Sequence, residues 1–263
     1  SFKDDIGSAH VDWCVKEKLK SSGKNYSYEP SKGNFRFLAP TWRPYDCIGY
    51  ISDKIVSSVT NTAGYLFFEN RDGFYFHNVE QMINERRGNP IEFTMIPNAS
   101  DCPQDEAAQT VITNINFNQQ KDMMTMLKSG NLSNEVKQIS ILDKTVNRYQ
   151  WALQDTWEDT EHLDDSAISI HTKNFHDEYV KGVDTARTFT VYDHTDFNDG
   201  APMQDETYIS RRIGYLLSLQ QMSATMGVHG NTKLKIGDCV ELTIPAATPF
   251  EGRDEEPFVG GVW

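Results

Sequence analysis

Hydrophobic and polar positions follow their clearest pattern between Tyr45 and Arg87. Pro44, just before this stretch, suits the first position of a helix, where its missing N–H costs nothing. The apolar residues that follow recur at spacings of three and four, as on one side of a helix: Ile48, Ile51, Ile55 and Val59. Asn61 and Gly64 are predicted to end this helix.

Two aromatic runs of strand length come next, at 65–69 and 74–78. The residues between them, 70–73, end in Asp-Gly, which is a strong signal for a hairpin turn. We therefore predict an antiparallel hairpin in which Gly73 adopts a positive φ. A second helix is predicted from Val79 to the Gly-Asn-Pro sequence at 88–90. The whole stretch predicts a helix–hairpin–helix.

The flanking patterns are shorter. Residues 6–20 have helical periodicity, and 35–38, 91–96 and 110–118 are predicted strands. A short Met-rich helix is predicted at 122–128, and an extended run at 136–145 continues through 147–151. The Met cluster (Met123, Met124 and Met126) is interpreted as core or interface.

The last third of the chain contains a helix and then alternating apolar positions. Asp205 is a good N-cap, and the predicted helix places Ile209, Ile213, Leu216 and Leu217 inward, with Arg211 and Arg212 in solvent. Strands are predicted at 224–228, 234–236 and 240–244, paired antiparallel across turns. Because no helical segment is predicted to link parallel strands, the fold class is α+β.

Composition and charge argue against several classes of protein. The formal net charge is −13, which argues against sequence-independent nucleic-acid binding. No run of eighteen apolar residues is present, so no membrane span is predicted. The four cysteines are scattered, which favours buried thiols over a disulfide framework: Cys14, Cys47, Cys102 and Cys239. The chain starts without Met or a signal-peptide pattern and ends in a strand-like run, so we expect a piece of a longer protein.

Candidate chemistry is concentrated in the acidic and His-rich region 155–200. Its possible metal ligands are His162, Asp164, Asp165, His171, His176, Asp177, Glu178, Asp193, His194 and Asp196. These residues lack the helical His spacing of a zinc site and the pattern of an EF-hand loop, so solvated loop charge is the favoured interpretation.

No other chemistry is marked out. The sequence has no Gly-x-Ser-x-Gly elbow, and Cys47 is interpreted as packing. The aromatic hairpin could stack bases or sugars, but only Arg71 lies near it, so packing on the flanking helices is favoured. We therefore assign no catalytic, cofactor-binding or metal-binding residue and predict a protein that is not an enzyme.

Three stretches together resemble the central baseplate hub protein of contractile-tailed bacteriophages, which is related to the base of type VI secretion spikes. They run from Arg43 to Met82, from Val111 to Thr145 and from Arg211 to Ile244. Their most distinctive segments are GYLFFENRDGFYFHNVEQM, ISILD and MGVHGNTKLKIGDCVELTIP. The resemblance lies in the order of structural patterns, and it covers most of the chain except the segment 154–205.

The resemblance implies a fold of two parts. An antiparallel β-barrel-like tube domain with a packed helix would comprise 104–150 and 204–263, and it would be the second tube domain of the hub. Residues 1–103 would form an outer α+β lobe that contains the helix–hairpin–helix. Residues 151–203 would be a loop-rich insertion associated with that lobe.

It also implies a function in the virion. The chain would form a homotrimeric, pseudo-hexameric ring that joins the tail tube to the central spike protein and surrounds the DNA channel, without a cofactor. It would assemble in the bacterial host cytoplasm, and DNA would pass along an acidic lumen without specific binding. Two alternatives remain: a hub of a secretion or contractile-injection particle, or a metal-dependent hydrolase that uses region 155–200.

Overall fold

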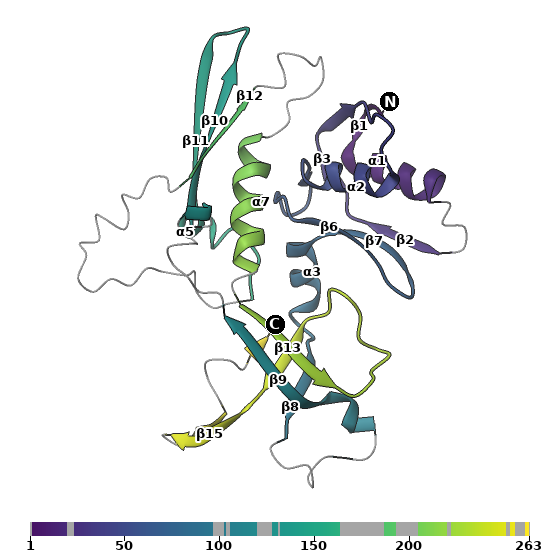
Figure 1. Cartoon of the computed structure of the whole chain (residues 1–263), viewed down its shortest axis with the longest axis vertical. Coiled ribbons are helices and arrows are strands. Elements are labelled where there is room, and N and C mark those ends of the chain that lie inside the picture. The colour runs from purple at the N-terminus through teal and green to yellow at the C-terminus, as the bar shows by residue number, and fades with distance from the viewer. Residues whose placement is uncertain are drawn as a thin grey trace, which may run out of the picture. The chain divides into compact units, whose positions relative to one another are not determined.

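The computed structural model describes residues 2–19, 24–96, 103, 106–119, 128–130, 132–163, 187–192, 205–219, 222–250, 253–255 and 261–262 (Figure 1). The chain forms two compact units. The first comprises 1–81 and 121–220, and the second comprises 82–120 and 221–263. This division groups 121–150 and 205–219 with the first unit, whereas the predicted tube domain joins them to the C-terminal residues. The predicted domain boundaries refer to a subunit within an assembled ring. The structure of one chain does not test them, so they stay a prediction.

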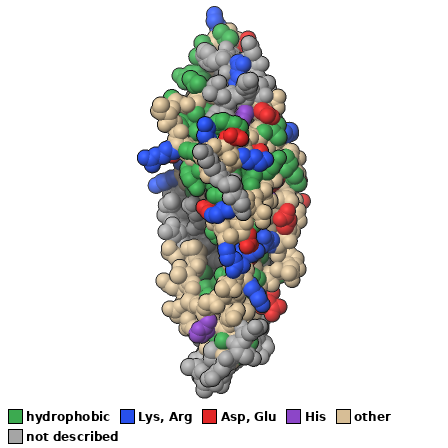
Figure 2. Space-filling view, turned by 90° about the vertical axis from the view of Figure 1, so that its right-hand side faces the viewer, with side chains coloured by type: hydrophobic (Ala, Val, Ile, Leu, Met, Phe, Trp, Pro, Cys, Tyr) green, Lys and Arg blue, Asp and Glu red, His purple; other side chains and the backbone are tan. Residues whose placement is uncertain are grey.

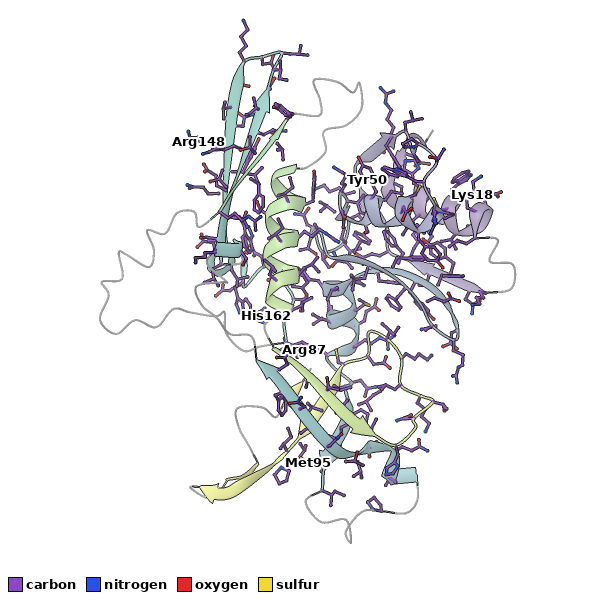
Figure 3. All side chains as sticks on the ribbon, viewed as in Figure 1. Lys18, Tyr50, Arg87, Met95, Arg148 and His162 are labelled. Atoms are coloured by element: carbon purple, nitrogen blue, oxygen red, sulfur yellow. The ribbon has the colours of Figure 1, made fainter. Side chains whose placement is uncertain are left out.

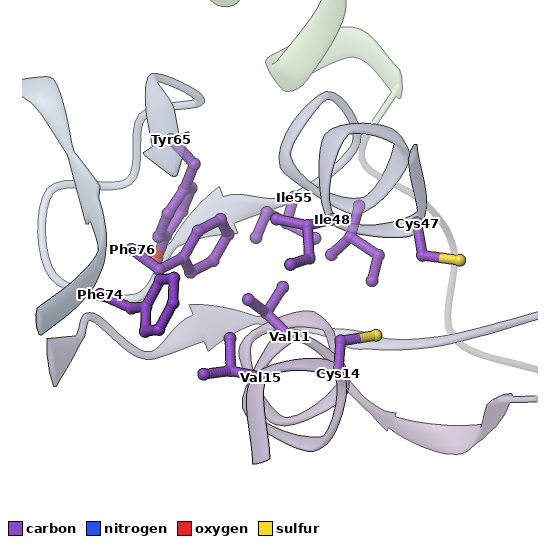
Figure 4. Packing of buried hydrophobic residues seen from close by; sticks show 10 residues of the cluster. Val11, Cys14, Val15, Cys47, Ile48, Ile55, Tyr65, Phe74 and Phe76 are labelled. Carbon is purple, nitrogen blue, oxygen red and sulfur yellow. The ribbon is translucent and has the colours of Figure 1, made fainter. Parts of the chain in front are cut away.

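The core of the first unit lies between two helical segments and an aromatic sheet. These are α1 (Gly7–Trp13), its π-helical continuation η1 (Cys14–Lys18), α2 (Pro44–Ser52), β2 (Asn25–Tyr28), β6 (Tyr65–Glu69) and β7 (Gly73–Asn78). The sheet order is β2-β7-β6. Figure 4 shows the helical residues Val11, Val15 and Ile48 and the strand residues Phe74 and Phe76 in this core. The predicted packing of the aromatic hairpin on its flanking helices is confirmed for α2 only: α1 and η1 provide the other helical side of this core, and α3 contributes no residue to it.

Helix α2 ends at Ser52, so the predicted helix to Asn61 is wrong in its second half. The chain leaves the helix because β5 (Val56–Ser57) pairs antiparallel with β3 (Ser31–Lys32). Ile55 still reaches the core, but Val59 is 61% exposed. The helical spacing of these two residues was therefore fortuitous.

The predicted hairpin is confirmed, and α3 (Val79–Arg86) follows it directly. Asn70 stabilises the turn, because its side-chain oxygen accepts hydrogen bonds from the backbone N–H groups of Asp72 (2.8 Å) and Gly73 (3.1 Å). The predicted positive φ at Gly73 is wrong, since only Gly33, Gly130 and Gly237 have one among the described glycines. Gly73 is instead the first residue of β7 and pairs with Asn25 of β2.

A second sheet of the first unit is a projecting hairpin with one added strand. Its strands are β10 (Ser133–Ser140), β11 (Thr145–Ala152) and β12 (Thr188–Tyr192), in the order β11-β10-β12. The predicted single extended run from 136 to 151 is wrong, because the chain turns at 141–144 and returns. Lys144 has a φ of 55° there. No glycine marks this turn, which explains why the sequence pattern did not show it. The short helix α5 (Leu153–Thr156) begins where β11 ends.

Helix α7 (Asp205–Leu219) was predicted correctly in extent, and the predicted inward residue Ile209 packs against a core cluster, but the position of Arg212 differs from the prediction. Arg212 is largely buried and pairs with Asp53 at 2.6 Å. Its guanidinium also donates to the backbone oxygens of Ser52 (3.2 Å), Ala63 (3.2 Å) and Tyr65 (3.5 Å). The predicted solvent position of Arg212 is therefore wrong: the side chain caps the C-terminal end of α2.

The second unit contains a five-stranded mixed sheet. Its strands are β8 (Ile91–Met95), β9 (Val111–Gln119), β13 (Met222–Val228), β14 (Val240–Thr243) and β17 (Gly261–Val262), in the order β13-β9-β8-β14-β17. Its core contains Phe93, Ile112, Leu242 and Ile244. The 3-10 helix η3 (Glu106–Thr110) precedes β9. A small ribbon pairs β15 (Pro245–Phe250) with β16 (Arg253–Glu255).

The predicted strand at 234–236 is wrong. Residues 231–239 form turns, and Leu234 and Ile236 are exposed. Asp238 holds this loop by accepting a hydrogen bond from the Lys235 backbone N–H (2.7 Å) and by pairing with Arg86 of α3. The loop is therefore held by an ion pair with α3, and the strand that the alternation predicted does not form.

The fold is mixed α+β, as predicted, but the purely antiparallel pairing is wrong. β8 pairs in parallel with β9 and β14, and β2 pairs in parallel with β7. Helix α2 lies between β2 and β7 in the sequence, so the prediction that no helical segment links parallel strands is also wrong. The remaining ribbon pairs β1 (Phe2–Ile6) with β4 (Asn34–Phe37). No sheet of the described residues closes into a barrel, so the barrel-like tube is not confirmed. In that part of the chain, no helix has the length and apolar character needed to cross a bilayer.

Candidate functional site

A buried polar cluster joins the hairpin to helix α3. The Asn78 side chain is fully buried, and its Nδ2 donates to Thr60 Oγ1 (3.2 Å) and Thr62 Oγ1 (2.8 Å). Its Oδ1 accepts from the Glu80 backbone N–H at 3.1 Å, which caps the start of the helix. The Glu29 carboxyl accepts from the Ser57 hydroxyl and from the Asn78 N–H. Because these hydrogen bonds are made within the cluster, it orders the chain and offers no open position to a ligand.

Glu80 is the strongest acid–base candidate among the described residues, and no sequence pattern indicated it. The residue is 1% exposed, and its Oε1 has no hydrogen-bond partner among the described residues. Burial raises the pKa of its carboxyl to about 8, although a Thr62 hydrogen bond and the charge of Arg211 oppose that shift. A raised pKa suits a general acid. However, the side chain is closed off from solvent, so we assign it a structural role.

The three cysteines that the structure describes do not form a nucleophilic site. Cys14, Cys47 and Cys239 are buried free thiols, as expected for packing residues. Burial and the neighbouring Cys47 raise the pKa of the Cys14 thiol to about 12, and burial also raises the pKa values of Cys47 and Cys239. A raised pKa disfavours the reactive thiolate. Cys102 lies outside the described residues.

The predicted metal-ligand region is described only in part. His162 stacks on the Trp157 ring, with 3.9 Å between the ring centroids. The other candidates lie outside the described residues: Asp164, Asp165, His171, His176, Asp177, Glu178, Asp193, His194 and Asp196. Within the described ranges, no three His, Cys, Asp or Glu side chains are grouped to hold a metal ion. The Met cluster at 123–126 is likewise outside them.

The most distinctive surface is one side of the sheet β11-β10-β12, which we call the open face. Residues in register form three rows across it: Val146–Ile139–Tyr192, Arg148–Lys137–Thr190 and Gln150–Glu135–Thr188. The first row is apolar and lies nearest the hairpin turn, and Val146 and Tyr192 are 56% and 62% exposed. The second row carries two cations, and Arg148 is exposed. Figure 3 shows Arg148 on the side of the sheet away from α7.

The opposite side of this sheet is packed. Asn134 of β10 donates from Nδ2 to the Ser210 backbone oxygen of α7 (3.3 Å). Trp151 of β11, which is in register with Asn134, lies against Gly214 of α7. The two sides therefore differ, as is common for an antiparallel hairpin with one buried side. The exposed apolar row on the open face is unusual for a side in contact with water only.

Charged side chains outside the open face do not define a second candidate surface among the described residues. On the side of the molecule shown in Figure 2, Lys and Arg side chains are interspersed with Asp and Glu side chains among the coloured residues. Cations near the aromatic hairpin are paired: Lys24 with Glu69, and Arg71 with Asp72 at 3.7 Å. These observations favour packing over nucleic-acid binding for the hairpin. The open face was missed by sequence reasoning because it exists only once the turn at 141–144 brings β10 and β11 together.

Comparisons with known proteins leave the family open. No protein-family model matches the sequence, and a search of curated proteins finds no match.

Proposed function

We propose that this protein is a structural subunit of a phage tail baseplate hub, and that it forms a homotrimeric ring between the tail tube and the central spike. The observation that carries the proposal is the order and spacing of three stretches, 43–82, 111–145 and 211–244, which resemble such hubs. A structural role is also supported by the buried state of the described thiols and of Glu80.

The tube domain of the proposal is built from residues 104–150 and 204–263. Two observations support assembly through sheets. β13 lies at one edge of the five-stranded sheet of the second unit, and β11 lies at one edge of the projecting sheet. Exposed edges pair readily with strands of another chain. In this proposal, the barrel is completed only when subunits and the neighbouring hub segments are in place.

The charge of the chain fits passage of DNA through such a ring. A net charge of −13 repels a polyanion, so DNA moves past the lumen without being held. The partners of the proposal are two further copies, a spike protein and a tail-tube or tube-initiator protein. The setting is the virion, after assembly in the bacterial cytoplasm.

Size-exclusion chromatography with light scattering tests the proposal. We expect a particle of three copies, each of 30.0 kDa, in equilibrium with monomer at micromolar concentration. A chain that stays monomeric over the accessible concentration range would contradict it. Metal analysis of the purified protein separates the hydrolase alternative, because a stoichiometric ion that resists dialysis would favour that class.

A further inference from the structure

The open face combines an apolar row with a cationic row, and this combination defines the partner it fits. Val146, Ile139 and Tyr192 supply contact area at the outer end of the sheet, and Arg148 and Lys137 lie in the next row. Lys137 pairs with the buried Glu135 at 3.5 Å, and Thr188 also donates to Glu135 at 3.3 Å. The charges of Lys137 and Glu135 therefore offset each other, and Arg148 supplies the remaining positive charge of the open face.

The sheet is basic in an otherwise acidic chain. Residues 132–152 and 187–192 contain four cations (Lys137, Lys144, Arg148 and Arg187) and two acids (Glu135 and Asp143), so their net charge is 4 − 2 = +2. The whole chain carries −13. A complementary partner presents carboxylates beside apolar side chains.

The same chain has such a surface directly after β11. Segment 153–163 contains four acidic residues and no Lys or Arg: Asp155, Glu158, Asp159 and Glu161. The first three are exposed, and Trp157 and Leu163 of the segment are half-buried, whereas Leu153 is buried. We call residues 153–163 the acidic segment. Its four carboxylates are opposite in charge to Arg148 of the open face.

The apolar row of the open face and the acidic segment lie at opposite ends of β11. Val146 lies near the hairpin turn, whereas the acidic segment begins at the other end of β11 (Figure 1). Leu153 lies seven positions after Val146 along extended strand, which corresponds to about 23 Å. Contact between the apolar row of the open face and the acidic segment therefore requires two copies of the chain.

We propose that the open face of one copy binds the acidic segment of the next copy. Such a contact joins two different surfaces and is therefore heterologous, and a heterologous contact closes into a ring when its rotation is suitable. This inference rests on the proposed function, because it names the surfaces through which the ring of that function would form. Apolar contact at Val146 and Tyr192 supplies affinity, and Arg148 facing carboxylates fixes the register.

A charge-swap experiment tests this contact by sedimentation velocity over a concentration series. Arg148→Glu alone, and Glu158→Arg with Asp159→Arg, are each expected to weaken self-association about tenfold or more. Combining all three substitutions is expected to restore at least part of the loss, because opposite charges again face each other. Arg71→Glu in the β6–β7 turn is the matched control, since Arg71 is exposed and outside both surfaces; it should leave self-association unchanged.

The outcomes separate this inference from the proposed function. If the unmodified chain self-associates and the charge-reversal variants associate equally well, the assignment of these two surfaces is wrong, and the hub proposal is unaffected. If the unmodified chain is monomeric at every concentration, both the hub proposal and this contact are wrong. Loss of self-association in the Arg148→Glu variant and in the Glu158→Arg, Asp159→Arg variant, without recovery when all three substitutions are combined, would also overturn the pairing of these surfaces. All the substitutions are at exposed positions, and unchanged melting temperatures confirm that each variant is folded.

Discussion

Gly73 and Asn25 lie so close that only a glycine fits at position 73. A Cβ built on Gly73 would be 2.1 Å from the backbone oxygen of Asn25. The contact arises because β2 pairs in parallel with β7, and this pairing begins at these two residues. Backbone cannot move aside as a flexible side chain can, so the sheet must separate locally to accept any other residue.

Gly73→Ala is therefore expected to destabilise the first unit by about 2 kcal/mol or more. The matched control is Gly49→Ala in α2, where an added Cβ meets nothing within 4 Å. There, the better helix propensity of alanine should stabilise the protein by about 0.5–1 kcal/mol. Urea titration followed by tryptophan fluorescence measures both changes. Equal effects of the two substitutions would refute the close approach of β2 to β7.

Gly73 shows which features could be predicted from the sequence alone and which could not. The Asp-Gly dipeptide correctly predicted the hairpin and its position, because turn chemistry is local. It could not show why Gly73 is needed, since the parallel partner β2 lies 48 positions earlier in the sequence. Local signals likewise found α7, whereas the turn at 141–144 and the parallel strand pairs were missed because they depend on tertiary pairing.

Arg212 provides a second test of tertiary structure. Its guanidinium binds three backbone oxygens at the end of α2 and nearby strands, and burial lowers its pKa while Asp53 opposes that shift. Arg212→Ala should cost about 2–4 kcal/mol, because the carbonyl groups lose their partner. Asp53→Asn should cost less than about 1 kcal/mol, since the Asp53 side chain is 61% exposed.

A third variant, Arg212→Lys, and the comparison of Asp53→Asn with Arg212→Ala test which contact of Arg212 dominates. Thermal unfolding of Arg212→Lys should fall near that of the alanine variant, because an ammonium group cannot reproduce the planar fork. If Asp53→Asn proved as damaging as Arg212→Ala, the ion pair would be the dominant interaction and the carbonyl contacts would be secondary.

Gly214 and Trp151 predict a non-additive pair. A Cβ on Gly214 would lie 2.0 Å from the Cη2 atom of Trp151, where α7 crosses the sheet. Gly214→Ala should therefore cost about 1–3 kcal/mol in the unmodified protein. In a Trp151→Leu background the space is free, and the same change should be neutral or slightly stabilising. A double-mutant cycle from urea titrations measures the coupling, and additive losses would show that the two elements do not pack this closely.

Glu80 predicts how stability changes with pH. Its pKa is raised from 4.5 to about 8 in the folded protein, mainly by burial. The folded state therefore binds the proton more tightly than the unfolded state. The resulting stability is fully present below pH 4.5 and is lost as pH rises towards 8. The slope from this one group is at most about 1.4 kcal/mol per pH unit within that window.

Glu80→Gln keeps the shape of the side chain and removes its titration. We expect the variant to be less stable than or equal to the unmodified protein at pH 5, and more stable at pH 8. The difference should grow by about 1 kcal/mol per pH unit between these values, allowing for relaxation around the buried group. Glu92→Gln, at an exposed position of β8, controls for the loss of one charge and should show no such growth. A pH-independent difference for Glu80→Gln would mean that Glu80 is ionised in the folded protein. The attraction between its carboxylate and a cation such as Arg211 would then outweigh the effect of burial on its pKa.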